Sequence, residues 1–291
     1  MRKPLRKVRL LRPVRPNAGL ESQYRKRLEG FVEKIHKSVV YFVSVGYRQH
    51  TPVLAQDASP ADWLAKIVKA LRHRWTKKID EAAPKLAEYF AKSVEKRSTD
   101  ALKKILKDSG IAVDFKLTAA MRDILDGTVN ANVALIKSIP QQYFTQIEGI
   151  VARGVTTGND LKQITDDLQQ QFNVSRKRAA FIASDQCNKA NSALTAERQR
   201  SIGVKSGVWR HSFGGRHPRK SHVEMDGKEF LLSEGLYDYQ IKKNTMPGRE
   251  INCRCFWSPL LPGLEDQFKG ERDREKAGVK SLREKATERA R

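Results

Sequence analysis

Residues 207–227 read GVWRHSFGGRHPRKSHVEMDG and residues 247–255 read PGREINCRC, and these two stretches set the fold of the second half of the chain. They lie among three segments rich in β-branched and aromatic residues, at 204–212, 228–232 and 253–260. Short segments of this kind between glycines and prolines are typical of strands separated by turns. We therefore expect a small sheet closed by loops.

The sequence before residue 203 is patterned for helices. Apolar residues recur three or four positions apart from Leu20 to Phe42 and again from Trp63 to Ile105, which is the spacing of amphipathic helices. Helix-ending residues divide this region. The expected helices cover residues 19–45, 60–109 with a kink or split at Pro84, 117–136 before the break at Ser138-Ile139-Pro140, 143–151, 161–172, and 175–202 capped by Ser175. The fold class predicted is α+β and predominantly helical.

Composition divides the 291 residues into four parts. Residues 1–17 are predicted to form a basic extended arm, because prolines at 4, 13 and 16 oppose a helix. An elongated helical docking region at 18–158 precedes a small mixed α+β domain at 159–262. A flexible tail is expected at 263–291, where charges of both signs accompany few large apolar residues.

The formal net charge is +23, from 56 Lys and Arg against 33 Asp and Glu. A compact chain with this charge repels itself unless an anionic partner offsets the repulsion, so we expect nucleic acid or an acidic protein surface. The arm is either a solvated, disordered terminus or a segment that lies on nucleic acid or in an acidic groove. Its basic residues are Arg2, Lys3, Arg6, Lys7, Arg9, Arg12 and Arg15, with no acidic residue among them.

Membrane insertion and secretion are not expected. No apolar run approaches the roughly 18 residues of a membrane span, and the basic N-terminus lacks the features of a secretory signal. Three cysteines, Cys187, Cys253 and Cys255, are too few and too unevenly spaced for a disulfide framework. This cysteine usage favours a reducing cytosol.

Four ordered sequence elements together resemble a known family. They are A-x-x-x-x-N-K-A-x-S at 183–192, a strand led by Trp209, PR-x-x-H-x-x-x-DG at 218–227 and PG-x-x-INCRC at 247–255. This order is similar to the Mu F-like domain of phage minor head proteins, in the phage head morphogenesis family, over roughly residues 160–260.

The resemblance implies a structural minor capsid protein of a tailed bacteriophage, made in the host cytoplasm and located in the head interior near the portal. It implies a role in head morphogenesis and in DNA packaging or delivery. The implied partners are the portal protein, the major capsid protein and viral double-stranded DNA. Contact with this DNA is expected to be non-specific, because Lys and Arg neutralise phosphates without reading bases.

Two interpretations of the histidines and cysteines in the second half of the chain remain open. His217, His222, Cys253 and Cys255 are residues of the types that bind zinc, which is the one cofactor we consider. The alternative, which we favour, is structural: both cysteines act as small apolar residues, while a polar knot holds the loops to the sheet. The knot would consist of Arg219, His222, Asp226 and Asn252.

An enzymatic interpretation uses some of the same residues. His222 would be a general base beside Asp226 or Glu224, and Arg254 would bind phosphate, as in a metal-dependent nuclease. The sequence has no second acidic cluster for a two-metal site and no nucleophile with an adjacent base. We therefore expect no catalytic residues, and keep a nuclease or DNA-binding protein carried in the virion as the alternative.

Overall fold

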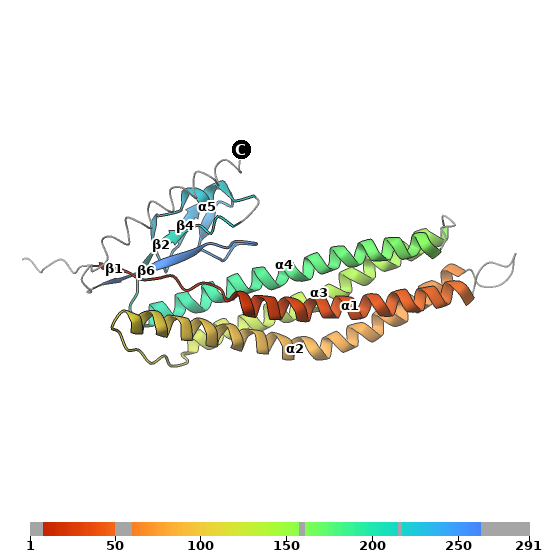
Figure 1. Ribbon diagram of the computed structural model, residues 1–291, viewed down its shortest axis with the longest axis horizontal. Helices are drawn as coiled ribbons and strands as arrows, with labels where there is room; N and C mark the ends of the chain where they lie inside the picture. Colours follow the sequence, from red (N-terminus) through yellow and green to blue (C-terminus); the bar gives the residue numbers. More distant parts are fainter. Residues whose placement is uncertain (1–7, 50–59, 157–160, 215–216, 263–291) are drawn as a thin grey trace, which may run out of the picture. The chain divides into compact units, whose positions relative to one another are not determined.

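The computed structural model describes residues 8–49, 60–156, 161–214 and 217–262. The described chain is α+β and predominantly helical, as predicted (Figure 1). The helices are α1 Ala18–Gln49, α2 Pro60–Asp108, α3 Ala119–Thr156, α4 Leu161–Ser201 and α5 Lys220–Glu224. The strands are β1 Val8–Leu10, β2 Ser206–Arg210, β3 Glu229–Leu231, β4 Leu236–Asp238, β5 Lys243–Thr245 and β6 Phe256–Pro262. The tail predicted for 263–291 and the basic residues Arg2, Lys3, Arg6 and Lys7 lie outside the described residues.

The breaks predicted at Ser138-Ile139-Pro140 and before Ser175 are wrong, and α2 is not split at Pro84. α2 continues through Pro84, α3 through Pro140, and α4 through Ser175. A proline inside a helix costs about 3 kcal/mol, but Ile136 and Ile139 beside Pro140 are buried. Packing of one continuous apolar face therefore outweighs the local preference, because most helical stability in proteins comes from such packing.

The chain forms two compact units, and α2, α3 and α4 contribute residues to both. One unit consists of residues 18–92 and 126–186. The other takes in the N-terminal stretch to Asn17, residues 93–125 and the chain from Cys187 onward. This division differs from the contiguous helical region 18–158 and the domain 159–262 expected from the sequence, because the long helices pass from one unit into the other.

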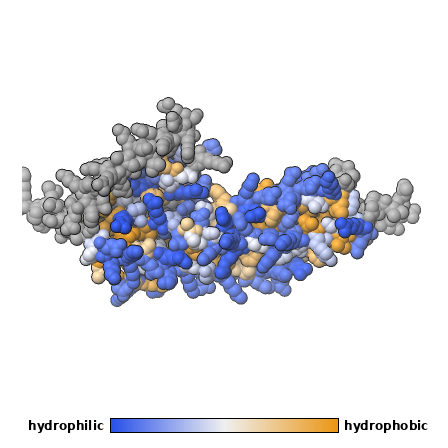
Figure 2. All heavy atoms as spheres, viewed as in Figure 1, coloured by the Kyte–Doolittle hydropathy of each residue, from blue (hydrophilic) through white to orange (hydrophobic). Residues whose placement is uncertain are grey.

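The unit of residues 18–92 and 126–186, the helical unit, is a four-helix bundle. Tyr24 of α1 stacks on Phe90 of α2, with ring centroids 4.2 Å apart, and donates a 2.9 Å hydrogen bond to Asn132 of α3. Asn132 in turn donates to Gln186 of α4. Side chains of all four helices thus meet at this level of the bundle. On the surface, hydrophilic side chains predominate on the face of the helices drawn in Figure 2.

The unit that includes Cys187 and the residues after it, the sheet unit, is built on a four-stranded antiparallel sheet in the order β1-β6-β2-β3. Trp209 of β2 pairs in register with Trp257 of β6. The side chains of these two residues and Phe230 are buried in one core cluster. A two-stranded sheet of β4 and β5 completes the β-structure. The strands predicted at 204–212, 228–232 and 253–260 correspond to β2, β3 and β6, whereas β1, β4 and β5 were not predicted.

The described part of the basic arm lies on the chain's own sheet. β1 pairs with β6, and the Leu11 N–H donates to the Pro259 carbonyl at 2.9 Å. Arg15 places its guanidinium 4.4 Å from the centre of the Phe256 ring, and Arg12 is exposed. The described residues 8–17 thus pack against the sheet unit, with Val8–Leu10 forming a strand.

A close contact joins α4 to the turn at Pro247 and Gly248. Ser192 of α4 donates a 2.6 Å hydrogen bond to the Pro247 carbonyl. Gly248 has a φ of 82°, and a Cβ added there would lie 3.1 Å from the Ser192 Cβ and 3.3 Å from the Cys255 carbonyl oxygen. Both its backbone conformation and its surroundings therefore require glycine.

Arg198 of α4 fastens the helix to its neighbours within the sheet unit. Its side chain is 6% exposed and pairs with Glu95 of α2 at 2.5 Å. It also donates to the Lys116 carbonyl at 2.6 Å and to Thr99 at 3.2 Å. The guanidinium lies over the Phe115 ring, 5.2 Å from its centre.

We expect Gly248→Ala to lower the free energy of unfolding by about 2–4 kcal/mol, because overpacking of about 1–3 kcal/mol adds to the left-handed backbone penalty. The matched control is Gly203→Ala, which has the same φ of 82° but no atom within 4 Å of the new Cβ. That variant should lose only about 1 kcal/mol. Urea unfolding measures both, and equal losses would contradict the close contact with α4.

Arg198→Met should lower the free energy of unfolding by about 2–4 kcal/mol, because Glu95 would keep a largely buried charge without its partner. Arg200→Met removes the more exposed pair with Glu197 and should cost less than about 1 kcal/mol. The double variant Arg198→Met with Glu95→Met should recover part of the loss in the same denaturation experiment. A double variant as unstable as the summed single variants would argue against the pair.

Candidate metal centre

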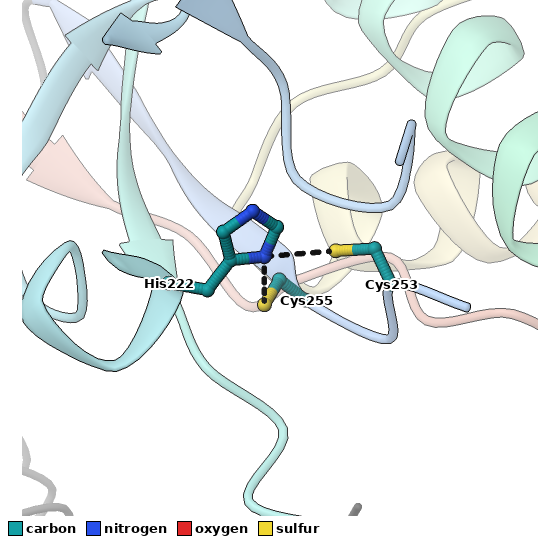
Figure 3. A group of neighbouring side chains, drawn as sticks. All are labelled: His222, Cys253 and Cys255. Carbon is teal, nitrogen blue, oxygen red and sulfur yellow. Dashed lines mark hydrogen bonds between the residues drawn. The ribbon is translucent and has the colours of Figure 1, made fainter. Parts of the chain in front are cut away.

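His222, Cys253 and Cys255 form a buried cluster in the sheet unit (Figure 3). The His222 Nδ1 atom lies 3.4 Å from the Cys253 Sγ atom and 3.8 Å from the Cys255 Sγ atom. Each residue offers one potential ligand atom, and these three atoms all lie within 4.8 Å of one another. The two sulfurs and one ring nitrogen thus converge on a common point.

Local backbone geometry explains why both sulfurs reach the same ring. Cys253 and Cys255 are two residues apart, and extended chain places side chains at this spacing on one face. The turn before them is closed by a hydrogen bond from the Cys253 N–H to the Glu250 carbonyl at 2.9 Å, and Asn252 has a φ of 57°. Asparagine tolerates this left-handed conformation better than most residues. The turn therefore aims the cysteine pair at His222.

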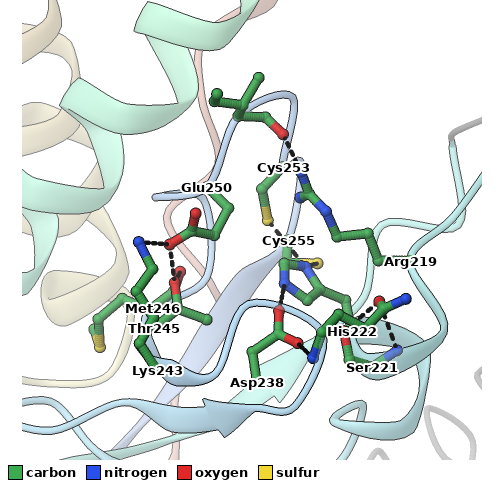
Figure 4. Close-up of polar contacts among 12 residues, drawn as sticks. Arg219, Ser221, His222, Asp238, Lys243, Thr245, Met246, Glu250, Cys253 and Cys255 are labelled. Atoms are coloured by element: carbon green, nitrogen blue, oxygen red, sulfur yellow. Dashed lines mark hydrogen bonds and ion pairs between the residues drawn. The ribbon is translucent and has the colours of Figure 1, made fainter.

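Asp238 fixes the orientation of the His222 ring (Figure 4). The His222 Nε2 atom is 3.0 Å from the Asp238 Oδ2 atom, and both side chains are almost fully buried. The Gln240 N–H donates to the other carboxylate oxygen at 2.9 Å. An ionised carboxylate can only accept, so Nε2 carries a proton, and Nδ1 is the ring nitrogen that faces the two sulfurs.

The pKa of Asp238 supports its ionised state. Burial acts to raise this pKa, but the Ser221 hydroxyl, the Gln240 N–H and the His222 ring together hold it below its usual value. The single proton of the Ser221 hydroxyl can instead be donated to the Gln240 side-chain carbonyl, whose oxygen lies 2.7 Å from the Ser221 Oγ atom. The Asp238 carboxylate therefore joins β4 to α5 and to the following residues 239–240.

The two thiols have different acidities. Hydrogen bonding from Cys255 lowers the pKa of Cys253 to about 4 against the opposing effect of burial, and His222 adds to the lowering. Burial raises the pKa of Cys255 well above its usual value, although the Trp209 indole acts in the opposite direction. The Gly248 N–H also donates to the Cys253 sulfur at 3.3 Å. The environment thus favours a thiolate at Cys253.

The cluster lies at a pocket of about 530 Å³ whose wall includes His211, Arg219 and Arg254. Burial lowers the pKa of His211 to about 4, so this ring is neutral at pH 7. Its Nδ1 atom accepts the Phe213 N–H at 3.1 Å, which leaves Nε2 as the protonated nitrogen. The Nδ1 lone pair of His211 is therefore occupied by the Phe213 N–H, and its Nε2 atom can only donate a hydrogen bond.

The structure brings three of the four zinc-candidate residues together. His217 is exposed and lines the same pocket, but it is outside the group of ligand atoms found among the described residues. Asp238, which completes the arrangement around His222, was not predicted. Asp238 lies in the segment LYDYQ, which belongs to no motif that the sequence analysis identified. Only the tertiary structure places it next to the His222 ring.

The residues of the predicted polar knot take separate roles. Arg219 donates to the Ile251 carbonyl at 2.8 Å, which ties α5 to the turn before Cys253. Asp226 accepts the His211 N–H at 2.8 Å. The carboxylate next to His222 is Asp238, so neither Asp226 nor Glu224 occupies the position that the nuclease interpretation gave them. Glu224 instead accepts from the Tyr239 hydroxyl at 3.2 Å.

Comparisons with known proteins agree with the family resemblance. Residues 145–258 match the family model for phage Mu protein F like protein. An uncharacterized protein of Haemophilus influenzae is 35% identical over 138 residues, which cover 47% of this chain and 30% of that protein. The NAD(+)–arginine ADP-ribosyltransferase EFV of Enterococcus faecalis is 22% identical over 135 residues, which cover 42% of this chain and 27% of that protein.

The matched segments span less than a third of the length of either curated relative, and no solved structure matches significantly. The family match covers α4 and the whole cluster of His222, Cys253 and Cys255. Over residues 145–258 this chain is therefore similar to the phage Mu protein F-like family.

Proposed function

We propose that this chain is a structural minor head protein of a tailed bacteriophage that acts in head morphogenesis. The observation that carries the proposal is the phage Mu protein F-like match over residues 145–258. Among the described residues, no helical stretch combines the length and apolar character that a membrane span needs. In this proposal the protein is made in the host cytoplasm and resides in the head interior near the portal.

The proposed docking element is the helical unit. Several large apolar side chains on its surface are exposed, and Tyr41 and Phe42 lie together near the end of α1, with exposed fractions of 62% and 37%. Their rings meet edge to face, with centroids 5.1 Å apart. Exposed aromatic side chains are enriched at protein interfaces, so this pair is suited to contact the portal or major capsid protein.

Replacing Tyr41 and Phe42 with serine should reduce the number of copies per head without lowering thermal stability, because both side chains are exposed. Quantitative mass spectrometry of purified heads, against the major capsid protein, measures copy number in the phage that encodes the chain. Tyr237→Ser, at a residue 61% exposed in the sheet unit, is the control. Absence of the unaltered chain from purified heads would refute the head-protein role itself.

Non-specific contact with packaged DNA is the second part of the proposal. It rests on the net charge of +23 and on the seven basic residues between Arg2 and Arg15. Arg12 is exposed beside β1. Cations placed in this way neutralise phosphates and release counterions, which gives affinity without sequence preference.

The triple variant Arg2→Ala, Lys3→Ala and Arg6→Ala should bind duplex DNA less tightly at low salt. Each lost phosphate contact reduces the slope of log K against log salt by about 0.9, so the slope should fall by roughly 2–3. Fluorescence anisotropy over a salt series measures it.

The control removes three lysines that are ion-paired within helices, Lys37→Ala, Lys92→Ala and Lys96→Ala. Equal slopes for the two triple variants would contradict a specific role for the arm. The same DNA incubated with Mg²⁺ tests the nuclease alternative. Magnesium prefers oxygen ligands, so the sulfur-containing cluster is unsuited to it and the DNA should stay intact; cleavage lost in His222→Ala would support the enzyme.

A further inference from the structure

The distances in the cluster match those of a metal site. Zinc binds cysteine sulfur at about 2.3 Å and histidine nitrogen at about 2.0 Å in tetrahedral geometry, which places ligand sulfur and nitrogen roughly 3.6 Å apart. The two distances from the His222 Nδ1 atom to sulfur are 3.4 and 3.8 Å, on either side of that value. These two distances are compatible with a tetrahedral ion bound by all three atoms, which lie within 4.8 Å of one another.

The hydrogen bonds around the cluster leave the ligand atoms in the required state. The 3.0 Å contact with Asp238 places the His222 proton on Nε2, and the Nδ1 lone pair is directed toward the sulfurs. Metal-binding histidines usually donate their second ring nitrogen to a carboxylate in this manner, which fixes the tautomer and raises ligand basicity. The Gly248 N–H at 3.3 Å from the Cys253 sulfur is oriented to stabilise a thiolate.

The same residues also suggest a cysteine nucleophile, with His222 as base and Asp238 as the group that orients it. A nucleophile needs one sulfur at the base, and a second thiol at the same nitrogen has no part in that chemistry. Here Cys255 lies 3.8 Å from the Nδ1 atom that Cys253 contacts. The convergence of two sulfurs on one lone pair favours a metal ion.

No fourth protein ligand is supplied by the described histidines at the pocket. His211 uses its Nδ1 atom to accept the Phe213 N–H, and His217 is exposed outside the ligand group. The pocket of about 530 Å³ borders all three cluster residues. A site with three protein ligands and a fourth position facing a pocket is the open arrangement of zinc centres that bind water or an exogenous ligand.

We propose that His222 Nδ1, Cys253 Sγ and Cys255 Sγ bind one zinc ion whose fourth coordination position opens to this pocket. Asp238 is the positioning residue for His222. Two thiolates and an imidazole are ligands of the soft and borderline class that selects zinc over magnesium or calcium. Arg219 and Arg254 at the pocket wall suit a small anion at the fourth position. The proposal does not depend on the head-assembly role.

Metal analysis of the full chain, purified without chelator, tests the proposal directly. We expect about one zinc per chain, with Cys253→Ser and Cys255→Ser each losing most of it. Cys187→Ser is the matched control, since Cys187 is also a buried cysteine outside any disulfide but lies outside the ligand group. A zinc-free wild-type protein that does not take up added Zn²⁺ would overturn the proposal. So would alkylation of Cys253 that proceeds equally fast with and without Zn²⁺, the result expected for a nucleophile.

Two further measurements address Asp238 and the open position. Asp238→Asn should weaken zinc affinity by roughly 10–100-fold in competition with a chromophoric chelator, as for other outer-shell carboxylates. In the Co²⁺-substituted protein, added azide should change the visible spectrum, because it can enter the fourth position. An unchanged spectrum in wild type would indicate a closed four-ligand site and overturn the open position. His217→Ala should retain one zinc per chain, and loss of the metal would assign His217 as that fourth ligand.

Discussion

The buried contact between His222 and Asp238 is the interaction on which the second half of the chain depends. It joins α5 to β4 over 3.0 Å and leaves the other nitrogen of the ring to face Cys253 and Cys255. Each of these segments is too short to hold its position by backbone hydrogen bonds alone. The carboxylate and imidazole must be buried together, since either one alone would be a costly unpaired polar group.

α4 supplies the rigid support for this arrangement. Ser192 holds the Pro247 carbonyl, and Gln199 accepts the Trp257 indole N–H at 2.7 Å, so one helix fixes both the turn before Cys253 and the strand after Cys255. Small residues along α4 and the absent side chain at Gly248 make the close approach possible.

Local patterns in the sequence were sufficient to predict the fold class and the strands β2, β3 and β6, and they named the three residues, His222, Cys253 and Cys255, that the structure brings together. They were insufficient where distant segments decide the outcome. Pro140 is a strong local helix breaker, yet the buried residues beside it keep α3 continuous. β1 falls within the predicted basic arm because Val8 and Leu10 stand among arginines and lysines, and its pairing partner β6 lies far away in the sequence, at Phe256–Pro262. Asp238 has no distinguishing neighbours, and its role follows only from its contact with His222.

A metal ion bound by this cluster would stabilise the fold of the sheet unit whether or not the protein has a catalytic activity. β3, β4 and β5 contain three residues each, and strands of that length contribute few ladder hydrogen bonds. Cys253 and Cys255 belong to the same buried cluster as Trp209, Phe230 and Trp257, so an ion there would fasten the loops directly to the core. Metal binding to residues that are dispersed in the unfolded chain adds its binding energy to folding. An ion with this structural effect is compatible with a head protein, and its open coordination position would then be a consequence of how few ligands the loops can bring together.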